Sequence, residues 1–306
     1  MYEKQLVQIQ GIIDRVFGIL LSEETKKKSE TVIITIAIVC FFIHLIGIYL
    51  KKFGWMSIEA HPELFSSPIA AIYTPFSFIL LYEAYLLVYY LPKSTTFYIA
   101  KQYEIITLIV IRRIFKDLSN LEFTEDWFNV SYDLQFTYDL IATIFLFFLI
   151  YLFYRLNSQK TIQKSGTEKR AETEKFILRK KIISIFLVPI FLVLAIYSVF
   201  NWVYISFTLS EMVDTIRDVN EIFFDEFFGI LILTDVLLLL LSFFYVDRFS
   251  LVIRNSGFVI STILIKLSFG TEGILNSVLI VVAVLFGVLV LWAQNLYAKI
   301  EPQGDF

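Results

Sequence analysis

Long runs of apolar residues constrain this chain more than any other feature. Six nearly continuous runs lie at 31–50, 69–91, 136–154, 182–203, 227–246 and 273–293, and two weaker, charged runs lie at 96–115 and 251–268. A bilayer core about 30 Å thick requires roughly 20 apolar residues in a helix. The runs are continuous rather than alternating, which favours helices over the strands of a barrel. The sequence therefore predicts an all-α, polytopic transmembrane helix bundle with about eight spans.

Two alternatives to eight spans follow from the charged runs. If both lie flat on the membrane surface, six spans remain, and if only one does, seven remain. The composition supports an apolar solvent in every case, because 58% of the 306 residues are hydrophobic, whereas soluble domains average about 45–50%.

Basic residues set the expected orientation. Nine of them lie between the fourth and fifth runs: Arg155, Lys160, Lys164, Lys169, Arg170, Lys175, Arg179, Lys180 and Lys181. Short loops rich in Lys and Arg face the cytoplasm. The neighbouring segments 117–133 and 211–226 are acidic, so we expect them outside, with both termini cytoplasmic. The expected location is a cell membrane, either plasma or inner, which the chain crosses several times.

Residues 1–30 are expected to form a separate amphipathic helix at the membrane interface, followed by a single transmembrane domain over 31–306. The segment from Leu6 to Leu21 carries apolar residues on one helical face: Ile9, Ile12, Ile13, Val16, Phe17 and Leu20. Such a helix lies at the inner membrane surface or packs on the bundle. The basic cluster Lys26–Lys28 follows the apolar stretch, whereas in a secretory signal peptide the basic region comes first.

Ionisable residues inside the apolar runs are the candidate functional residues. They are His44, Glu83, Lys101, Glu104, Arg112, Arg113, Asp139 and Asp235. A charge at the bilayer centre costs at least about 2.5–3.5 kcal/mol on insertion scales, so each of these groups must have a partner or a function.

The run 96–115 concentrates these charges along one line. Lys101, Glu104, Leu108, Arg112 and Lys116 are separated by three, four, four and four residues. This spacing places them on one face of a helix. A charged stripe cannot face lipid, so we expect it to face the bundle interior or a wet cavity.

Depth along the helices predicts which of these groups are neighbours. A tight turn from Pro92 to Thr95 makes the second and third spans an antiparallel hairpin, which places Glu83 level with Glu104. Lys101 lies one turn closer to the cytoplasm. Two carboxylates at one depth will not both ionise cheaply, so one of them is expected to be protonated unless Lys101 reaches them.

Three further pairings are expected from depth. Arg112 and Asp139 lie at similar depth on consecutive spans and form a plausible ion pair. Asp235 lies near the midplane, where Thr234 and a neighbouring helix are its expected partners. His44 is expected to form a hydrogen bond to a neighbouring helix or to take part in a proton relay. The second histidine, His61, lies in an outer loop, which argues against a haem between two histidines.

No enzyme motif is present, and no cofactor or metal is expected. Phosphate-binding glycine loops, a nucleophile elbow and a helical histidine pair are all missing, and Cys40 is the only cysteine. The lipid bilayer is the main expected partner, with anionic headgroups at the basic loop of about 155–181. A homo-oligomer or a membrane partner is possible, and nothing indicates nucleic-acid binding.

The favoured function is therefore a channel or transporter for an ion, a proton or a small polar solute. Its path would be lined by the third span with Glu83, Glu104, Arg112 and Asp235, and protonation of the Glu83–Glu104 pair would gate it. The alternative is a non-transporting sensor or scaffold protein that binds partners through its basic loop or its acidic outer loops.

Overall fold

The chain is almost entirely helical. The computed structural model describes residues 2–55, 65, 68–118, 131–158, 167–208, 219–245, 248–271 and 273–300. Their elements are α1 (Tyr2–Leu20), α2 (Glu23–Lys52), the short 3-10 helix η2 (Pro68–Ile72), α3 (Tyr73–Tyr90), α4 (Thr95–Leu118), α5 (Ser131–Ser158), α6 (Thr167–Thr208), α7 (Val219–Ser242), α8 (Phe249–Ser268) and α9 (Gly273–Ile300). These residues contain no strand, which confirms the all-α prediction.

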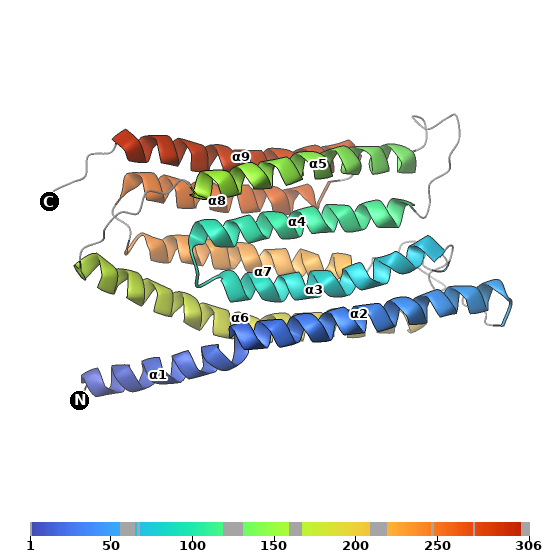
Figure 1. The fold of residues 1–306 in the computed structure, drawn as a ribbon, viewed down its shortest axis with the longest axis horizontal. Helices are drawn as coiled ribbons and strands as arrows, with labels where there is room; N and C mark the ends of the chain where they lie inside the picture. Colours follow the sequence, from blue (N-terminus) through green and yellow to red (C-terminus); the bar gives the residue numbers. More distant parts are fainter. Residues whose placement is uncertain are drawn as a thin grey trace.

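Each of the eight predicted runs coincides with one helix from α2 to α9. The charged runs 96–115 and 251–268 are α4 and α8, and both lie lengthwise among the other helices (Figure 1). Within the described residues, five segments are long and apolar enough to cross a membrane: Gln10–Lys52, Asp133–Ser158, Glu174–Tyr197, Phe249–Ser268 and Gly273–Tyr297. α1 begins and α9 ends at the same end of the bundle (Figure 1).

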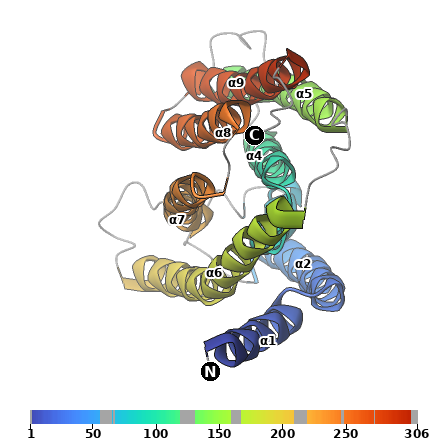
Figure 2. The same cartoon turned by 90° about the vertical axis from the view of Figure 1, so that its left-hand side faces the viewer.

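Helices α3 to α9 pack in a closed ring. Going round it, each helix contacts the next in the order α3, α4, α5, α9, α8, α7 and α6, and α6 returns to α3. α2 packs on α3, and α1 packs on α6, so both lie outside the ring (Figure 2). The order is not sequential, because α9 is inserted between α5 and α8.

The outer surface of the bundle is apolar. Phe145, Phe147, Phe186, Val193 and Leu233 each expose more than half of their side chains. A contiguous apolar surface of this kind is unfavourable in water and marks contact with an apolar phase. It supports a membrane protein, with lipid as the solvent of this surface.

α4 is the most enclosed helix of the bundle. None of its side chains that the structure describes is exposed, and Tyr98, Ala100 and Tyr103 are almost completely buried. The stripe positions Lys101, Glu104 and Leu108 are half-buried, so they form the more open side of the helix. The predicted stripe is therefore not the most enclosed side of α4, although its member Arg112 is buried.

Local signals set the helix ends. Ser22 caps α2 by accepting a hydrogen bond from the Thr25 amide at 3.0 Å, and Glu23 and Glu24 in the first turn favour the positive end of the helix dipole. At the other end Gly54 adopts a φ of 73°, and the amides of Gly54 and Trp55 bond back to Lys51 and Leu50. This is the Schellman arrangement, in which a left-handed glycine ends a helix.

The predicted hairpin of the second and third spans is present. α3 ends at Tyr90 and α4 begins at Thr95, and the Lys93 amide donates to the Tyr90 carbonyl at 3.0 Å within the turn. The two helices then run antiparallel in contact with each other (Figure 1).

The N-terminal segment is helical, but the separate helix α1 ends at Leu20 rather than near residue 30, because residues 23–30 form the first turns of α2. α1 packs on the first part of α6, where Lys181 forms an ion pair with Asp14 at 2.7 Å. Its position at a membrane interface stays a prediction. The basic loop proves to be largely helical, because α5 continues to Ser158 and α6 starts at Thr167. Residues 159–166, His61 and most of the two acidic segments lie outside the described residues.

Candidate functional site

The predicted site residues other than Arg112, which is buried on α4, lie in four separate clusters rather than in one line. One surrounds Asp139, one surrounds Glu104, one contains His44, and one surrounds Asp235. Three of the four include residues of α4, which lies between them.

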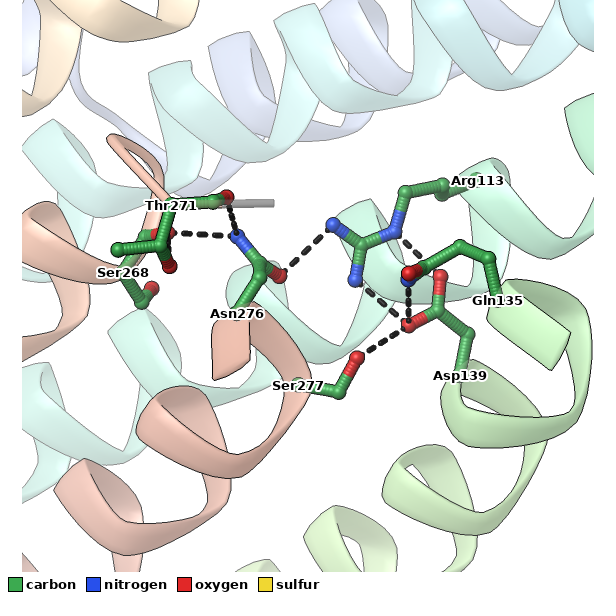
Figure 3. Close-up of polar contacts among 7 residues, drawn as sticks. All are labelled: Arg113, Gln135, Asp139, Ser268, Thr271, Asn276 and Ser277. Atoms are coloured by element: carbon green, nitrogen blue, oxygen red, sulfur yellow. Dashed lines mark hydrogen bonds and ion pairs between the residues drawn. The ribbon is translucent and has the colours of Figure 1, made fainter. Parts of the chain in front are cut away.

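Arg113, not Arg112, is the partner of Asp139. Both its Nε and its Nη2 donate to the carboxylate, the latter at 2.7 Å (Figure 3). The prediction that Arg112 forms this pair is wrong, because consecutive residues on a helix point about 100° apart. Depth alone places both arginines level with Asp139, and only the direction of the side chain decides between them.

The Asp139 carboxylate is fully satisfied although it is completely buried. Besides Arg113, it accepts hydrogen bonds from Gln135 at 3.0 Å and from Ser277 at 2.6 Å. Arg113 also donates to Asn276 at 2.8 Å. These donors, including a two-pronged guanidinium, satisfy the hydrogen-bonding capacity of the buried carboxylate.

Asn276 connects this ion pair to the α8–α9 turn. Its amide nitrogen donates to the carbonyls of Ser268 at 2.6 Å and of Thr271 at 3.2 Å (Figure 3). The network therefore joins α4, α5, α8 and α9. Sequence reasoning missed Asn276 and Ser277, although two adjacent polar residues near the start of the last apolar run were a readable signal.

Lys101 and Glu104 form the second cluster. Their ion pair measures 2.6 Å, and the Tyr154 hydroxyl of α5 donates to the other oxygen of Glu104. Glu83 lies within electrostatic range of both residues, as the depth comparison predicts. The Lys101 ammonium also lies over the ring of Tyr90 at 5.4 Å. The expected neighbourhood of two glutamates and a lysine is therefore present, on the more open side of α4.

His44 lies apart from the other clusters. Its Nδ1 is 2.6 Å from the Thr74 hydroxyl, and its ring packs on Phe65 with centroids 5.0 Å apart. The expected hydrogen bond to a neighbouring helix is confirmed, since Thr74 belongs to α3.

Asp235 forms the third α4 cluster with Gln102. The amide nitrogen of Gln102 donates to Asp235 Oδ2 at 2.9 Å, and its oxygen accepts from Thr262 of α8 at 3.1 Å. Asp235 is only 3% exposed. The expected partner on a neighbouring helix is confirmed by Gln102 of α4. The expected Thr234 partner is wrong, because the Thr234 hydroxyl donates to the Ile230 carbonyl of its own helix.

Lys180 belongs to the interior and not to the lipid headgroups. Its side chain is 3% exposed, and its ammonium donates to the Thr95 hydroxyl at 3.1 Å and to the Lys93 carbonyl at 3.2 Å. For this residue the expectation of a headgroup contact is wrong. Three lysine or arginine residues are consecutive at 179–181, and the sequence does not show which of them the rotation of α6 turns inward.

A small cavity lies between Lys180 and Asp235. Its volume is about 20 Å³, and Tyr98, Asn255 and Ser242 also line it. Neither Asp235 Oδ1 nor the Tyr98 hydroxyl makes a hydrogen bond of good geometry to any described residue. Buried polar atoms of this kind are rare and point to a function or to bound water.

α8 contributes a polar stripe that sequence reasoning missed. Its buried polar residues are Ser250, Arg254, Asn255, Ser261, Thr262 and Ser268. The spacing of four and then seven residues places them on one helical face, and this face is turned toward α4 and α9. The Tyr103 hydroxyl is 2.8 Å from Ser261 Oγ, which in turn donates to the Ala283 carbonyl. The seven-residue spacing of Arg254, Ser261 and Ser268 is visible in the sequence and is the signal of this stripe.

Asp139 and Asp235, two of the buried aspartates, differ in their surroundings. Asp139 accepts four hydrogen bonds from three side chains, and a guanidinium balances its charge. Asp235 Oδ2 accepts a hydrogen bond from the Gln102 amide, and the carboxylate lines the cavity together with the neighbouring Tyr98 hydroxyl. The first arrangement holds helices together, whereas the second leaves a carboxylate able to bind something else. An intramembrane acid with such an environment is a functional candidate.

Comparison with other proteins adds no assignment. No protein-family model, curated protein or solved structure matches the chain. Within the described residues, no group of three or more His, Cys, Asp or Glu side chains could hold a metal ion. The function must therefore be argued from the clusters themselves.

Proposed function

We propose that the chain is a channel or transporter whose path runs through the ring of helices, along the face of α4 that carries Gln102. In this proposal α2 to α9 all cross the membrane and both termini are cytoplasmic. The transported species is an ion, a proton or a small polar solute. The observation that supports it most is the convergence of Lys180 and Asp235, two deeply buried ionisable groups, on one cavity.

The inner face of α4 has the pattern of a closed path. Thr95, Tyr98 and Gln102 supply polar groups near its start, and Arg113 supplies one near its end. At 1.5 Å per residue, Thr95 and Arg113 lie about 27 Å apart along the axis, close to the thickness of a bilayer core.

The apolar residues Ile106 and Ile109 lie between these polar groups on the same face and are buried. Hydrophobic constrictions close channels by excluding water. The structure is therefore that of a closed state in this proposal.

In this proposal the cluster of Lys101, Glu104 and Glu83 does not line the path. Glu104 and Gln102 are two residues apart, so they point to nearly opposite sides of α4. The pair first expected to gate the path therefore lies beside it. We assign the central role to Asp235 and keep Glu83 and Glu104 as modulators from the α3 side.

Replacing Asp235 with asparagine is expected to reduce transport by about tenfold or more, because the amide cannot carry charge or exchange a proton. The measurement is flux of protons, sodium, potassium and chloride into liposomes that contain the purified protein. Glu226→Gln is the matched control, since Glu226 lies on the same helix with an exposed side chain.

Unchanged flux in Asp235→Asn would contradict the assignment of Asp235. No flux of any kind with the native protein, together with a partner that co-purifies stably, would favour the sensor or scaffold class. Glu83→Gln and Glu104→Gln are expected to change flux less than Asp235→Asn does.

A further inference from the structure

We infer that the species exchanged at Asp235 is the proton, and that Lys180 passes it to and from this carboxylate through the cavity between them. This inference rests on the proposed function and specifies its substrate. It depends on the size of the cavity, on the charges around it and on the hydrogen bonds that each group already makes.

The size of the cavity limits what it can hold. The volume available to a water-sized sphere is about 20 Å³. A site for one water needs about 10–15 Å³ of such volume. A sugar, an amino acid or a hydrated metal ion is larger than this space and would have to extend out of its open side. A single water, by contrast, can form hydrogen bonds to Lys180, to Asp235 Oδ1 and to the Tyr98 hydroxyl, which all belong to residues of the lining.

The number of free ligands argues against a bare metal cation. Hard cations take about six oxygen ligands, and the side-chain oxygens of the lining belong to Asp235, Tyr98, Thr95, Ser242 and Asn255. The Thr95 hydroxyl already accepts from the Lys180 ammonium and the Asn255 oxygen from the Arg254 guanidinium, which leaves fewer oxygens than a hard cation takes.

The charges around the cavity also disfavour a metal cation. The titratable groups within electrostatic range of Asp235 are Tyr98 and Tyr103 from α4 and Lys180 from α6. Arg254 from α8 lies within electrostatic range of Lys180. The ammonium already provides one positive charge beside the carboxylate. A second cation would be repelled, whereas a proton moving from Lys180 to Asp235 leaves the total charge unchanged.

The transfer is a simple acid–base step. An N–H bond of the Lys180 ammonium breaks, its proton passes through one water, and an O–H bond forms at Asp235 Oδ1, so that two charged groups become two neutral ones. Lys180 is held by the Lys93 carbonyl at the α3–α4 turn, which places it between this end of the bundle and Asp235. The Gln102 amide holds Asp235 Oδ2 and leaves Oδ1 to accept the proton.

The test compares two lysines that are neighbours in the sequence. Lys180→Met removes the proposed carrier, whereas Lys181→Met removes a surface charge that pairs with Asp14. Both variants and Asp235→Asn are placed in liposomes, and proton uptake is followed with a pH-sensitive dye beside sodium and potassium flux. We expect proton flux to fall about a hundredfold in Lys180→Met and Asp235→Asn and to stay unchanged in Lys181→Met.

Infrared difference spectroscopy gives a second measurement that needs no transport. A carboxylic-acid carbonyl band that titrates with pH and is missing in Asp235→Asn would show proton exchange at this residue. If Lys180→Met does not fold, Lys180→Gln serves in its place. The band is expected to persist in Lys181→Met.

The possible outcomes separate this inference from the proposed function. Sodium or potassium flux that is lost in Asp235→Asn, without proton flux, would overturn the proton as substrate and leave the path in place. Proton flux that survives in Lys180→Met would overturn the role of Lys180. No flux of any ion, together with no titrating band at Asp235, would overturn both.

Discussion

Replacing Arg113 with methionine is expected to lower the free energy of unfolding by about 3–5 kcal/mol, the usual cost of leaving a buried charge without its partner. Asp139 is completely buried and receives two of its hydrogen bonds from Arg113. Methionine keeps much of the side-chain volume but supplies no donor. The midpoint of thermal unfolding of the detergent-purified protein measures the loss.

The second partner gives a sharper test of this ion pair. In the double variant Arg113→Met with Asp139→Asn, no buried charge remains, so much of the stability should return. The interaction between the two changes is then the coupling energy of a double-mutant cycle. Arg155→Met is the control, because Arg155 lies in the last turn of α5 with an exposed side chain. Equal losses for Arg155→Met and Arg113→Met would show that the network does not hold the helices together.

Replacing Gly287 with alanine is expected to lower the free energy of unfolding by about 3 kcal/mol, from overpacking and a lost buried hydrogen bond together. A Cβ at this position of α9 would overlap the Tyr103 hydroxyl and lie 2.8 Å from its ring carbon Cζ. Tyr103 is fully buried and bonded to Ser261. It cannot keep both its place and this bond beside a methyl group.

Two companion variants identify the cause. Tyr103→Phe removes the oxygen nearest to the new methyl group. It should therefore lower the free energy of unfolding less in the Gly287→Ala protein than in the native protein. Gly229→Ala is the control, since a Cβ there meets only the end of Lys266 at an ordinary 3.6 Å. This change should be neutral or slightly stabilising, as alanine favours helix over glycine by about 1 kcal/mol. A Gly287→Ala protein as stable as the native chain would contradict the close approach of α4 and α9.

Much of the fold follows from the sequence, but less of the candidate site does. All eight apolar runs are helices, and the turn after Tyr90 is where the proline and the polar residues place it. The nearness of Glu83 to Glu104 also follows, because a short turn fixes the depth of one helix against the other. By contrast, the pairing of Asp139 with Arg113 required the direction of each side chain.

Lys180 shows why the rest could not be predicted. A run of basic residues reads the same in the sequence whether its side chains face lipid headgroups, water or the protein interior. The rotation of α6 about its axis, set by its packing on neighbouring helices, decides which side chain points inward. The same holds for Asp235, whose partner Gln102 is 133 positions away. Gln102 is uncharged and lies between Lys101 and Glu104. Nothing in this local sequence indicates that its amide contacts Asp235.

The sequence by itself determined the helices, their apolar surfaces and the approximate depth of each charge, because hydrophobic run length and helical periodicity are properties of one segment. The tertiary structure alone decided that α9 lies between α5 and α8, that Asp139 is satisfied, and that Asp235 and Lys180 share a cavity. The physical reason is that burial and hydrogen bonding are properties of pairs of helices. Their angles and rotations depend on how all the side chains of the ring pack together.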